Sequence, residues 1–423
     1  MMLHPVLDSV FHAFEEAGVR WCLLRVPLDL GAPKGDVDLL IDRVDIESVR
    51  GVLGSLGFIQ LQPCSGHIHF LTYHPPTDCW IWLDIVTELS FGRHNALQTR
   101  AEVGCLARRQ YLGAVVTLAR DDEFWALLLH CILDKGAIAP RHAAKLQELM
   151  GEVRTDGPLA QVVEAVSPTG WTLRRILECV SSRDWIALER MAPSLAATWM
   201  RQHAIAPWQF LNRWGLGLMD YLVRLRSWRG LSVALLGPDG AGKTTLILDI
   251  QESFYLPVRS VYMGLTGGLL RYIAYLHVPG LVLLGRLLVF WCRYLLAQYH
   301  QIRGRLVLFD RYVYDGMTPH PERLNWLRRA SRWVDAHACP GPDLVLVLDA
   351  PGEVMYARKG EYTPEQLEEW RQCFLGLQQR ISQLEIVDTT RDRDAVRIDV
   401  TDRIWQRYVA HWGSNSRVRC SAN

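Results

Sequence analysis

GPDGAGKTT, residues 237–245, is the stretch that decides the fold of the C-terminal half of the chain. It satisfies the pattern G-x-x-x-x-G-K-[ST], whose fixed positions are occupied by Gly237, Gly242, Lys243 and Thr244. An apolar run at residues 231–236 precedes the stretch, and a helix-like run at residues 246–250 follows it. The sequence therefore predicts a strand, a glycine-rich loop and a helix in that order, which is the setting that this pattern requires.

The loop is expected to hold the phosphates of a nucleotide. Glycines let successive backbone N–H groups point at phosphate oxygens, and the following helix N-terminus adds free N–H groups and a positive dipole end. Lys243 would reach the β- and γ-phosphates and the Thr244 hydroxyl would hold Mg²⁺, so ATP and Mg²⁺ are the expected cofactors. The predicted nucleotide contacts are Gly237, Asp239, Gly240, Ala241, Gly242, Lys243, Thr244 and Thr245. The alternative is a glycine turn that binds nothing.

Composition favours a multidomain globular protein. A chain of 423 residues is too long for one ordinary core, and 49% hydrophobic with 22% charged residues is the balance of a packed fold. The net charge of +1 gives no reason to expect a nucleic-acid partner. Ten cysteines without C-x-x-C pairs, and an N-terminus that reads as an amphipathic helix and not as a signal peptide, indicate reduced thiols in the cytoplasm.

Three aspartates in the N-terminal third form a candidate metal site. Asp36 and Asp38 alternate with apolar residues, so both carboxylates point to one face of a strand, and Asp84 in a second strand-like run could approach them. Three such carboxylates would suit Mg²⁺. The alternative is a turn cap, a solvated residue and a locally paired strand residue. His67 and His69 also share one strand face, for which we favour an ordinary, partly exposed strand.

This combination resembles the nucleotidyltransferase superfamily of the polymerase β type over roughly the first hundred residues. The resemblance implies an α+β domain in which Asp36, Asp38 and Asp84 bind the metals that carry an incoming nucleoside triphosphate. The family usually has Gly-Ser or Gly-Gly upstream of the carboxylate pair to hold the triphosphate. This chain has Leu-Arg-Val-Pro at residues 24–27, so Arg25 could contact a phosphate instead.

Between these regions the pattern becomes helical, with breaks at Gly157-Pro158 and near Pro168. Within it, the segment 130–145 carries several charged residues and histidines, and it either borders the N-terminal site or forms a solvated helix end. We therefore predict a nucleotidyltransferase-like domain at residues 1–118, a helical connector at 119–229, a nucleotide-binding domain at 230–412 and a tail at 413–423.

The C-terminal half has an α/β pattern. Apolar runs at residues 260–263, 305–309, 343–348 and 384–387 read as short strands separated by helical stretches. They predict a buried parallel sheet whose ligands lie beyond the C-terminal ends of the strands.

Three motifs together resemble the thymidylate kinase family of P-loop nucleotide kinases, over roughly residues 231–412. They are the loop GPDGAGKTT, the strand end FDRY at 309–312, and PDL at 342–344 followed by a lid-like ARKGE at 357–361. The resemblance implies that Asp310 binds the metal's water or accepts a proton and that Arg311 clamps an acceptor phosphate. Arg358 and Lys359 would neutralise charge on the transferring phosphoryl group. The alternative is a strand-end ion pair and a solvated turn.

The acceptor side departs from that family. In place of an Arg-Glu-Pro type motif, residues 262–268 are followed by a long apolar stretch at 269–299 that carries Arg271, Arg286 and Arg293. Because Arg286 and Arg293 interrupt each window, it does not read as a membrane span. We favour buried or subunit-facing helices over a wall for a lipid-linked acceptor or a peripheral membrane contact. Dimers are common among relatives of the kinase domain, so a homodimer is predicted by resemblance.

The sequence thus predicts an ATP-dependent phosphotransferase that moves the γ-phosphoryl group to a nucleotide monophosphate or a related phosphate-bearing acceptor. Lys243, Asp310, Arg311 and Arg358 are the expected catalytic residues, and Thr244 with Asp310 the expected metal ligands. Two alternatives remain open. The N-terminal domain could transfer a nucleoside monophosphate while nucleotide binding acts as a switch, or both domains could act in sequence in a cell-envelope or secondary-metabolite pathway.

Overall fold

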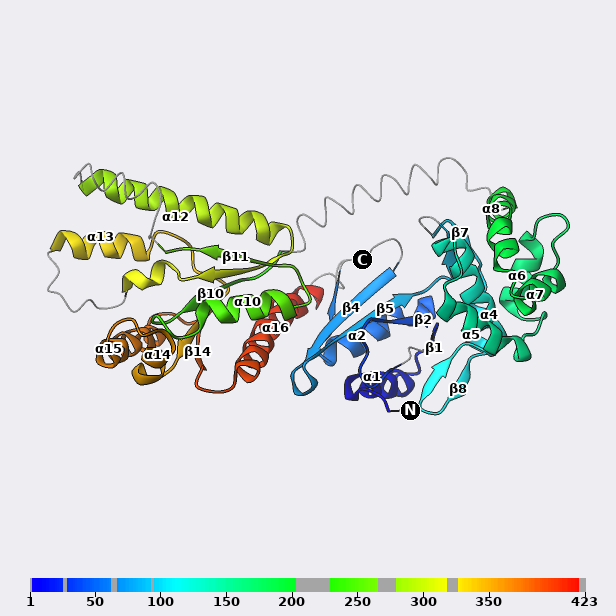
Figure 1. The fold of residues 1–423 in the computed structure, drawn as a ribbon, viewed down its shortest axis with the longest axis horizontal. Coiled ribbons are helices and arrows are strands. Elements are labelled where there is room, and N and C mark those ends of the chain that lie inside the picture. Colours follow the sequence, from blue (N-terminus) through cyan, green and yellow to red (C-terminus); the bar gives the residue numbers. More distant parts are fainter. Residues whose placement is uncertain are drawn as a thin grey trace. The chain divides into compact units, whose positions relative to one another are not determined.

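The computed structural model describes residues 2–25, 29–61, 67–92, 95–202, 229–264, 279–317 and 326–417. The chain divides into two compact units, Met1–Leu218 and Met219–Asn423 (Figure 1). The boundary between them lies outside the described residues. Each unit has its own sheet, so each is described by itself.

The N-terminal unit is built on a mixed seven-stranded sheet in the order β3-β4-β5-β2-β1-β9-β8. Its strands are β1 (Trp21–Leu23), β2 (Asp36–Ile41), β3 (Ile59–Gln60), β4 (His67–His74), β5 (Cys79–Val86), β8 (Gln110–Leu112) and β9 (Val115–Thr117). The hairpin β6 (Ser90–Phe91) and β7 (Leu97–Gln98) forms a separate two-stranded sheet. Strands β2 and β5 are parallel, although β2 is antiparallel to β1 and β5 is antiparallel to β4.

Helices complete the same unit. They are α1 (Pro5–Glu16), α2 (Ile46–Ser55), α3 (Glu102–Ala107), α4 (Arg120–Leu129), α5 (Pro140–Leu149), α6 (Pro158–Val166), α7 (Leu173–Ser181) and α8 (Trp185–Gln202). A π-helical turn, η4 (His130–Lys135), continues α4, and short 3₁₀ turns lie at η1 (Arg43–Asp45), η2 (Pro75–Thr77) and η5 (Met150–Glu152).

One hydrophobic core joins the helices to the sheet. It runs from Leu7 on α1 through the strands to Trp199 on α8, which is fully buried. On α1 the buried residues recur at intervals of three and one, which is the single stripe expected of an amphipathic helix. Trp21 stacks on Phe11 with ring centroids 4.5 Å apart. The predicted helical segment after residue 119 is therefore packed on the sheet as part of one compact unit.

The C-terminal unit has a five-stranded sheet in the order β11-β12-β10-β13-β14, and every neighbouring pair is parallel. Its strands are β10 (Ser232–Leu236), β11 (Val258–Tyr262), β12 (Leu306–Asp310), β13 (Leu344–Asp349) and β14 (Leu384–Asp388). All five residues of the central strand β10 are buried. The predicted parallel α/β sheet is confirmed, and the glycine-rich loop follows its central strand.

Helices lie on both sides of this sheet. They are α10 (Lys243–Ser253), α12 (Pro279–Ile302), α13 (Trp326–Ala336), α14 (Gly352–Lys359), α15 (Pro364–Leu375) and α16 (Arg393–Arg417), with 3₁₀ turns η6 (Val313–Met317) and η7 (Gly376–Gln379). Figure 1 shows α12 and α13 on one side of the strands and α10 and α16 on the other. A parallel sheet needs this cover because both of its faces are apolar.

Candidate functional sites

The glycine-rich loop lies at the C-terminal edge of the sheet, where β10 ends and α10 begins. Gly240 has a φ of +89°, and a Cβ placed on it would lie 2.5 Å from the carbonyl oxygen of Met355. Gly242 has a φ of +98° but would meet nothing within 4 Å. Only glycine therefore fits at position 240, where the loop passes directly against α14.

Lys243 is the first residue of α10 and is buried. Its ammonium group donates to the carbonyl oxygens of Gly237 and Pro238, each at 2.8 Å. Burial lowers the pKa of this amine, and the Asp239 carboxylate opposes the shift. The lysine thus lies inside the loop that it is predicted to serve. Thr244 and Thr245 follow it on the exposed side of the helix N-terminus, whereas Ala241 is buried.

The Asp239 carboxylate lies near three cationic side chains. Its Oδ1 atom lies 2.9 Å from Nη2 of Arg311, 3.8 Å from Nζ of Lys359 and 4.0 Å from Nζ of Lys243. These cations come from the strand end after β12, from the end of α14 and from the start of α10. The predicted loop, strand-end and lid residues therefore meet at one carboxylate.

Asp310 is the last residue of β12, in register with Leu235 of β10 and Tyr262 of β11. Because β10 and β12 are parallel neighbours, Asp310 lies at the same sheet edge as the loop, and its charge acts on Lys243. Arg311, the next residue, adopts a φ of +66°. Backbone in this region is uncommon for a non-glycine residue, and it places the Arg311 side chain against Asp239.

Arg358 and Lys359 separate at the end of α14. Lys359 contacts Asp239 and also lies 3.0 Å from a Glu361 oxygen. Arg358 instead donates from Nη2 to the carbonyl oxygen of Thr389, at 2.7 Å, just after β14. In this structure it is thus held beside β14, and its predicted catalytic role stays a prediction.

The sequence interpretation missed Asp315 on the turn η6. Burial raises the pKa of its carboxyl to about 6, against the opposing charges of Arg311 and Lys243. The available signal was its position five residues after Asp310, directly after the apolar and aromatic residues 312–314. That signal is weak because the helical turn that carries Asp315 back toward the loop is not apparent from periodicity.

The predicted carboxylate cluster of the N-terminal unit is brought together by strand register. Asp38 on β2 pairs with Asp84 on β5, and Asp36 lies on the same face as Asp38. One oxygen from each of Asp36, Asp38 and Asp84 lies within 4.8 Å of the others. Asp84 is buried, Asp38 is partly buried and Asp36 is exposed.

Cations and imidazoles surround this cluster. Arg25 Nη2 lies 2.7 Å from Asp38, and His67 Nδ1 lies 2.9 Å from both oxygens of Asp84. His69 Nδ1 is 3.4 Å from Asp84 and accepts from Nε1 of Trp82. Burial raises the pKa of Asp38, and the neighbouring aspartates add to the shift against Arg25. The hydrogen bond to Asp84 raises the pKa of His67. Three repelling carboxylates of this kind fit a hard divalent cation such as Mg²⁺.

The π-helical turn η4 borders this cluster. His130 lies 2.8 Å from Asp134, whose other oxygen accepts from the backbone N–H of Gly92 at 2.6 Å. The charge of Asp134 contributes to the raised pKa of His67. These contacts favour the interpretation that segment 130–145 borders the N-terminal site. π-helical turns occur often at functional sites.

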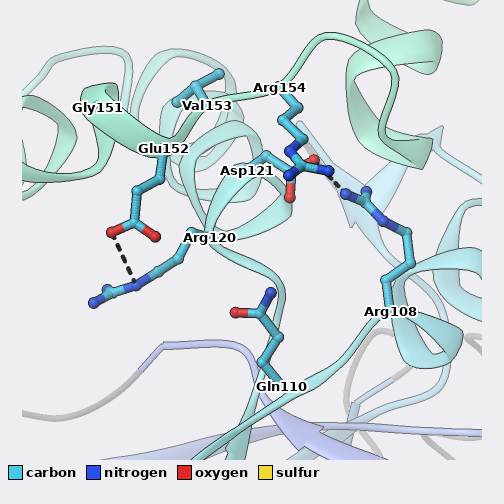
Figure 2. A pocket seen from close by; sticks show the side chains of 8 residues that line it. All are labelled: Arg108, Gln110, Arg120, Asp121, Gly151, Glu152, Val153 and Arg154. Atoms are coloured by element: carbon cyan, nitrogen blue, oxygen red, sulfur yellow. Dashed lines mark hydrogen bonds and ion pairs between the residues drawn. The ribbon is translucent and has the colours of Figure 1, made fainter.

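A polar pocket of about 410 Å³ lies elsewhere in the N-terminal unit (Figure 2). Arg108, Arg120 and Arg154 line it together with Asp121 and Glu152. Arg108 Nη2 binds Asp121 at 2.7 Å, and Arg120 Nε lies 3.9 Å from Glu152. Because Arg108 forks between two adjacent buried aspartates at the start of α4, we interpret this group as a structural brace. The pocket contains none of the predicted site residues.

Comparison with known proteins adds little to this geometry. No protein-family model and no curated protein matches the chain. Among solved structures, the chain is similar to the thymidylate kinase of Candida albicans. That structure was reported to reveal the origin of the enzyme's broad substrate specificity. The TM-score is 0.36 at 18% identity, over 43% of this chain and 93% of that chain. At this TM-score the similarity carries no argument about activity, so the proposals below rest on the residues themselves.

Proposed function

We propose that the C-terminal unit is an ATP- and Mg²⁺-dependent phosphotransferase that acts on a nucleotide monophosphate or another phosphate-bearing acceptor. The observation that supports it best is the contact between Asp239 in the loop and Arg311 at the end of β12, beside Asp310. It brings the glycine-rich loop, a carboxylate and an arginine to one edge of a parallel sheet. Ligands of open parallel sheets bind at this edge.

Each residue has a distinct role in this proposal. The loop amides and Lys243 hold the β- and γ-phosphates, and Arg311 grips the acceptor through its planar fork. Mg²⁺ held by Thr244 and Asp310 would supply charge neutralisation between the phosphates. Alternatively, Asp310 would accept the acceptor's proton. Lys359 balances negative charge on the transferring phosphoryl group. Arg358 would join it if the end of α14 moves.

Binding requires rearrangement at two of these groups. Lys243 must exchange the carbonyl oxygens of Gly237 and Pro238 for phosphate oxygens. Arg311 must leave Asp239 to reach an acceptor. Phosphate oxygens are stronger acceptors for a cation than neutral carbonyls, so the first exchange is favourable once a triphosphate is present.

ATP binding and ADP formation with a panel of acceptors test the proposal. Lys243→Ala is expected to abolish ATP binding. Asp310→Asn is expected to keep ATP binding while transfer falls by about 10²-fold or more, because a group that acts in the transition state is lost. Lys145→Ala, on α5 of the other unit, is the control and should change neither. Bound ATP without ADP formation on any acceptor would contradict the proposal.

A second candidate function is nucleotidyl transfer by the N-terminal unit, and the convergence of Asp36, Asp38 and Asp84 favours it. In this alternative the C-terminal loop binds nucleotide as a switch, or the two units act in sequence. Transfer of label from an α-phosphate-labelled nucleotide separates it from the first. Label transfer that is lost in Asp38→Asn supports the N-terminal site, whereas label transfer unchanged in Asp38→Asn rejects it.

A further inference from the structure

The outward face of α12 is apolar. Within Val282–Ile302, the exposed residues are Leu284, Leu288, Trp291, Cys292, Leu295, Leu296, Tyr299 and Ile302. They recur at helical intervals and form one stripe, which we call the α12 stripe. A helix on the surface of a globular domain normally turns its polar side to water. The outward side of α12 is apolar instead, and its other positions hold Arg286, Arg293 and the buried Gln301 beside apolar core residues.

Contacts on the inner side fix this rotation of α12. The Arg293 guanidinium lies 5.6 Å from the ring centroid of Tyr262 at the end of β11, and its Nη1 donates to the Gly264 carbonyl. Arg286 forms an ion pair with buried Asp335 of α13. Turning the arginines to solvent would leave the Asp335 carboxylate unpaired and buried, which is costly. The α12 stripe therefore faces outward as a consequence of packing.

A basic cluster lies at the C-terminal end of the α12 stripe. Arg303 is exposed and donates from Nη1 to the Tyr299 hydroxyl at 2.7 Å. Arg305 binds His300 at 3.0 Å, and Arg259 lies close enough to affect the charge of the same imidazole. From residue 279 to residue 309 the sequence contains no aspartate or glutamate. The helix thus joins an apolar stripe to cations that have no acidic partner on the same segment.

Helix α12 packs against its own unit along its length, so it does not read as a membrane-spanning helix. Among the described residues, Val282–Ile302 alone has the length and mean hydropathy, 1.2, for a membrane span. However, α12 packs against β11, β12 and α13, and its Phe290 and Ala297 belong to the core of the sheet. Crossing a bilayer would remove these residues from the core. A helix of 21 residues is about 31 Å long, enough to lie across many lipid headgroups.

We propose that α12 docks the C-terminal unit on the surface of an anionic phospholipid bilayer. The α12 stripe enters the boundary between headgroups and acyl chains, with Trp291 and Tyr299 at the level that aromatic rings prefer. Arg303 and Arg259 contact lipid phosphates, which supply the negative charge absent from the helix. A second copy of the chain would also cover the stripe, but its α12 offers these cations no carboxylate.

Cosedimentation of the full chain with vesicles tests this proposal. Wild type should bind phosphatidylcholine vesicles that contain phosphatidylglycerol, bind pure phosphatidylcholine more weakly, and dissociate as salt is raised. The double substitution Leu288→Glu and Leu295→Glu should lower partition about tenfold or more, because it replaces inserted side chains by charges of the lipid's sign. Leu248→Glu on α10 is the control, since Leu248 is 54% exposed, like Leu284, and lies off the stripe.

Substitutions of the basic cluster test the contact with lipid phosphates separately from the insertion of the α12 stripe. Arg303→Gln with Arg259→Gln should reduce only the preference for anionic over neutral vesicles. Retained ATP binding by each variant would show that the C-terminal unit is folded. The proposal is overturned if wild type does not bind anionic vesicles at low salt, or if the double glutamate variant binds as well as wild type. It is also overturned if wild type is a dimer that ignores vesicles and that the glutamates dissociate, because a second copy then covers the stripe.

Discussion

Replacing Gly240 by alanine should destabilise the C-terminal unit through two separable effects. The first is the backbone, because a φ of +89° costs an L-residue about 1–2 kcal/mol. The second is contact, because the new Cβ would lie 2.5 Å from the Met355 carbonyl, which belongs to the backbone of α14 and cannot rotate away. Overpacking of this kind costs about 1–3 kcal/mol. The sum is roughly 2–5 kcal/mol.

Gly242→Ala is the matched control. Its φ of +98° imposes a similar backbone cost, but its Cβ would meet no atom within 4 Å, so only about 1–2 kcal/mol is expected. Amide hydrogen exchange of peptides from β10 and α14 reports on the C-terminal unit without interference from the other unit. Exchange in α14 should be faster in Gly240→Ala than in Gly242→Ala by about five- to a hundredfold. Equal exchange in the two variants would refute the close approach of the loop to α14.

Three further changes test other parts of the structure. Trp199→Ala should cost about 3–5 kcal/mol and accelerate exchange in helices and strands of the N-terminal unit together, because one core joins them; acceleration confined to α8 would contradict that core. The hydrogen bond with Arg393 lowers the pKa of Asp249 in the folded protein. The Asp249–Arg393 pair therefore stabilises the fold at pH values above the pKa of Asp249 in the unfolded chain, and this stabilisation is lost as pH falls through its pKa in the folded protein. Asp249→Asn should therefore lower the Tm at pH 7 and leave it nearly unchanged at acidic pH, as thermal unfolding would show. With a pKa of about 6, Asp315 repels a triphosphate above that pH, so ATP affinity should rise as pH falls through 6 in wild type and vary less in Asp315→Asn, by titration calorimetry.

The parts of the fold that could be predicted are those with a local cause. The loop pattern and its flanking runs predict β10 and α10 because they need no distant partner. The period of two in β2 places Asp36 and Asp38 on one face, and parallel pairing with β5 then brings Asp84 to Asp38. The strand end after β12 was likewise expected beside the loop. In each case the side-chain direction follows from the backbone of a regular element.

Contacts between segments that are distant in the chain could not be predicted from the sequence. Asp239 and Arg311 are 72 positions apart, and nothing in either motif indicates that they pair. The expected position of Arg358 at the phosphates stays a prediction, and its hydrogen bond to the Thr389 carbonyl, just after β14, could not be foreseen from the sequence. Of the stretch 269–299, for which buried or subunit-facing packing was predicted, residues 269–278 lie outside the described part of the chain. The apolar composition of the stretch did not indicate which side of α12 faces the sheet, and the α12 stripe is exposed in its own unit.

Asp239 connects the two binding events of the proposed phosphotransfer. One carboxylate faces Arg311, Lys359 and Lys243. Water screens the attraction of Asp239 to half-exposed Lys359 more than its attraction to buried Lys243. A triphosphate in the loop would carry more negative charge than Asp239, so Lys243 and Lys359 would shift toward it first. Arg311 then keeps the aspartate as its neighbour until an acceptor phosphate arrives with a bidentate site. In the proposed reaction, nucleotide binding would thus remove two of the three cations from Asp239 and leave Arg311 beside it until the acceptor binds.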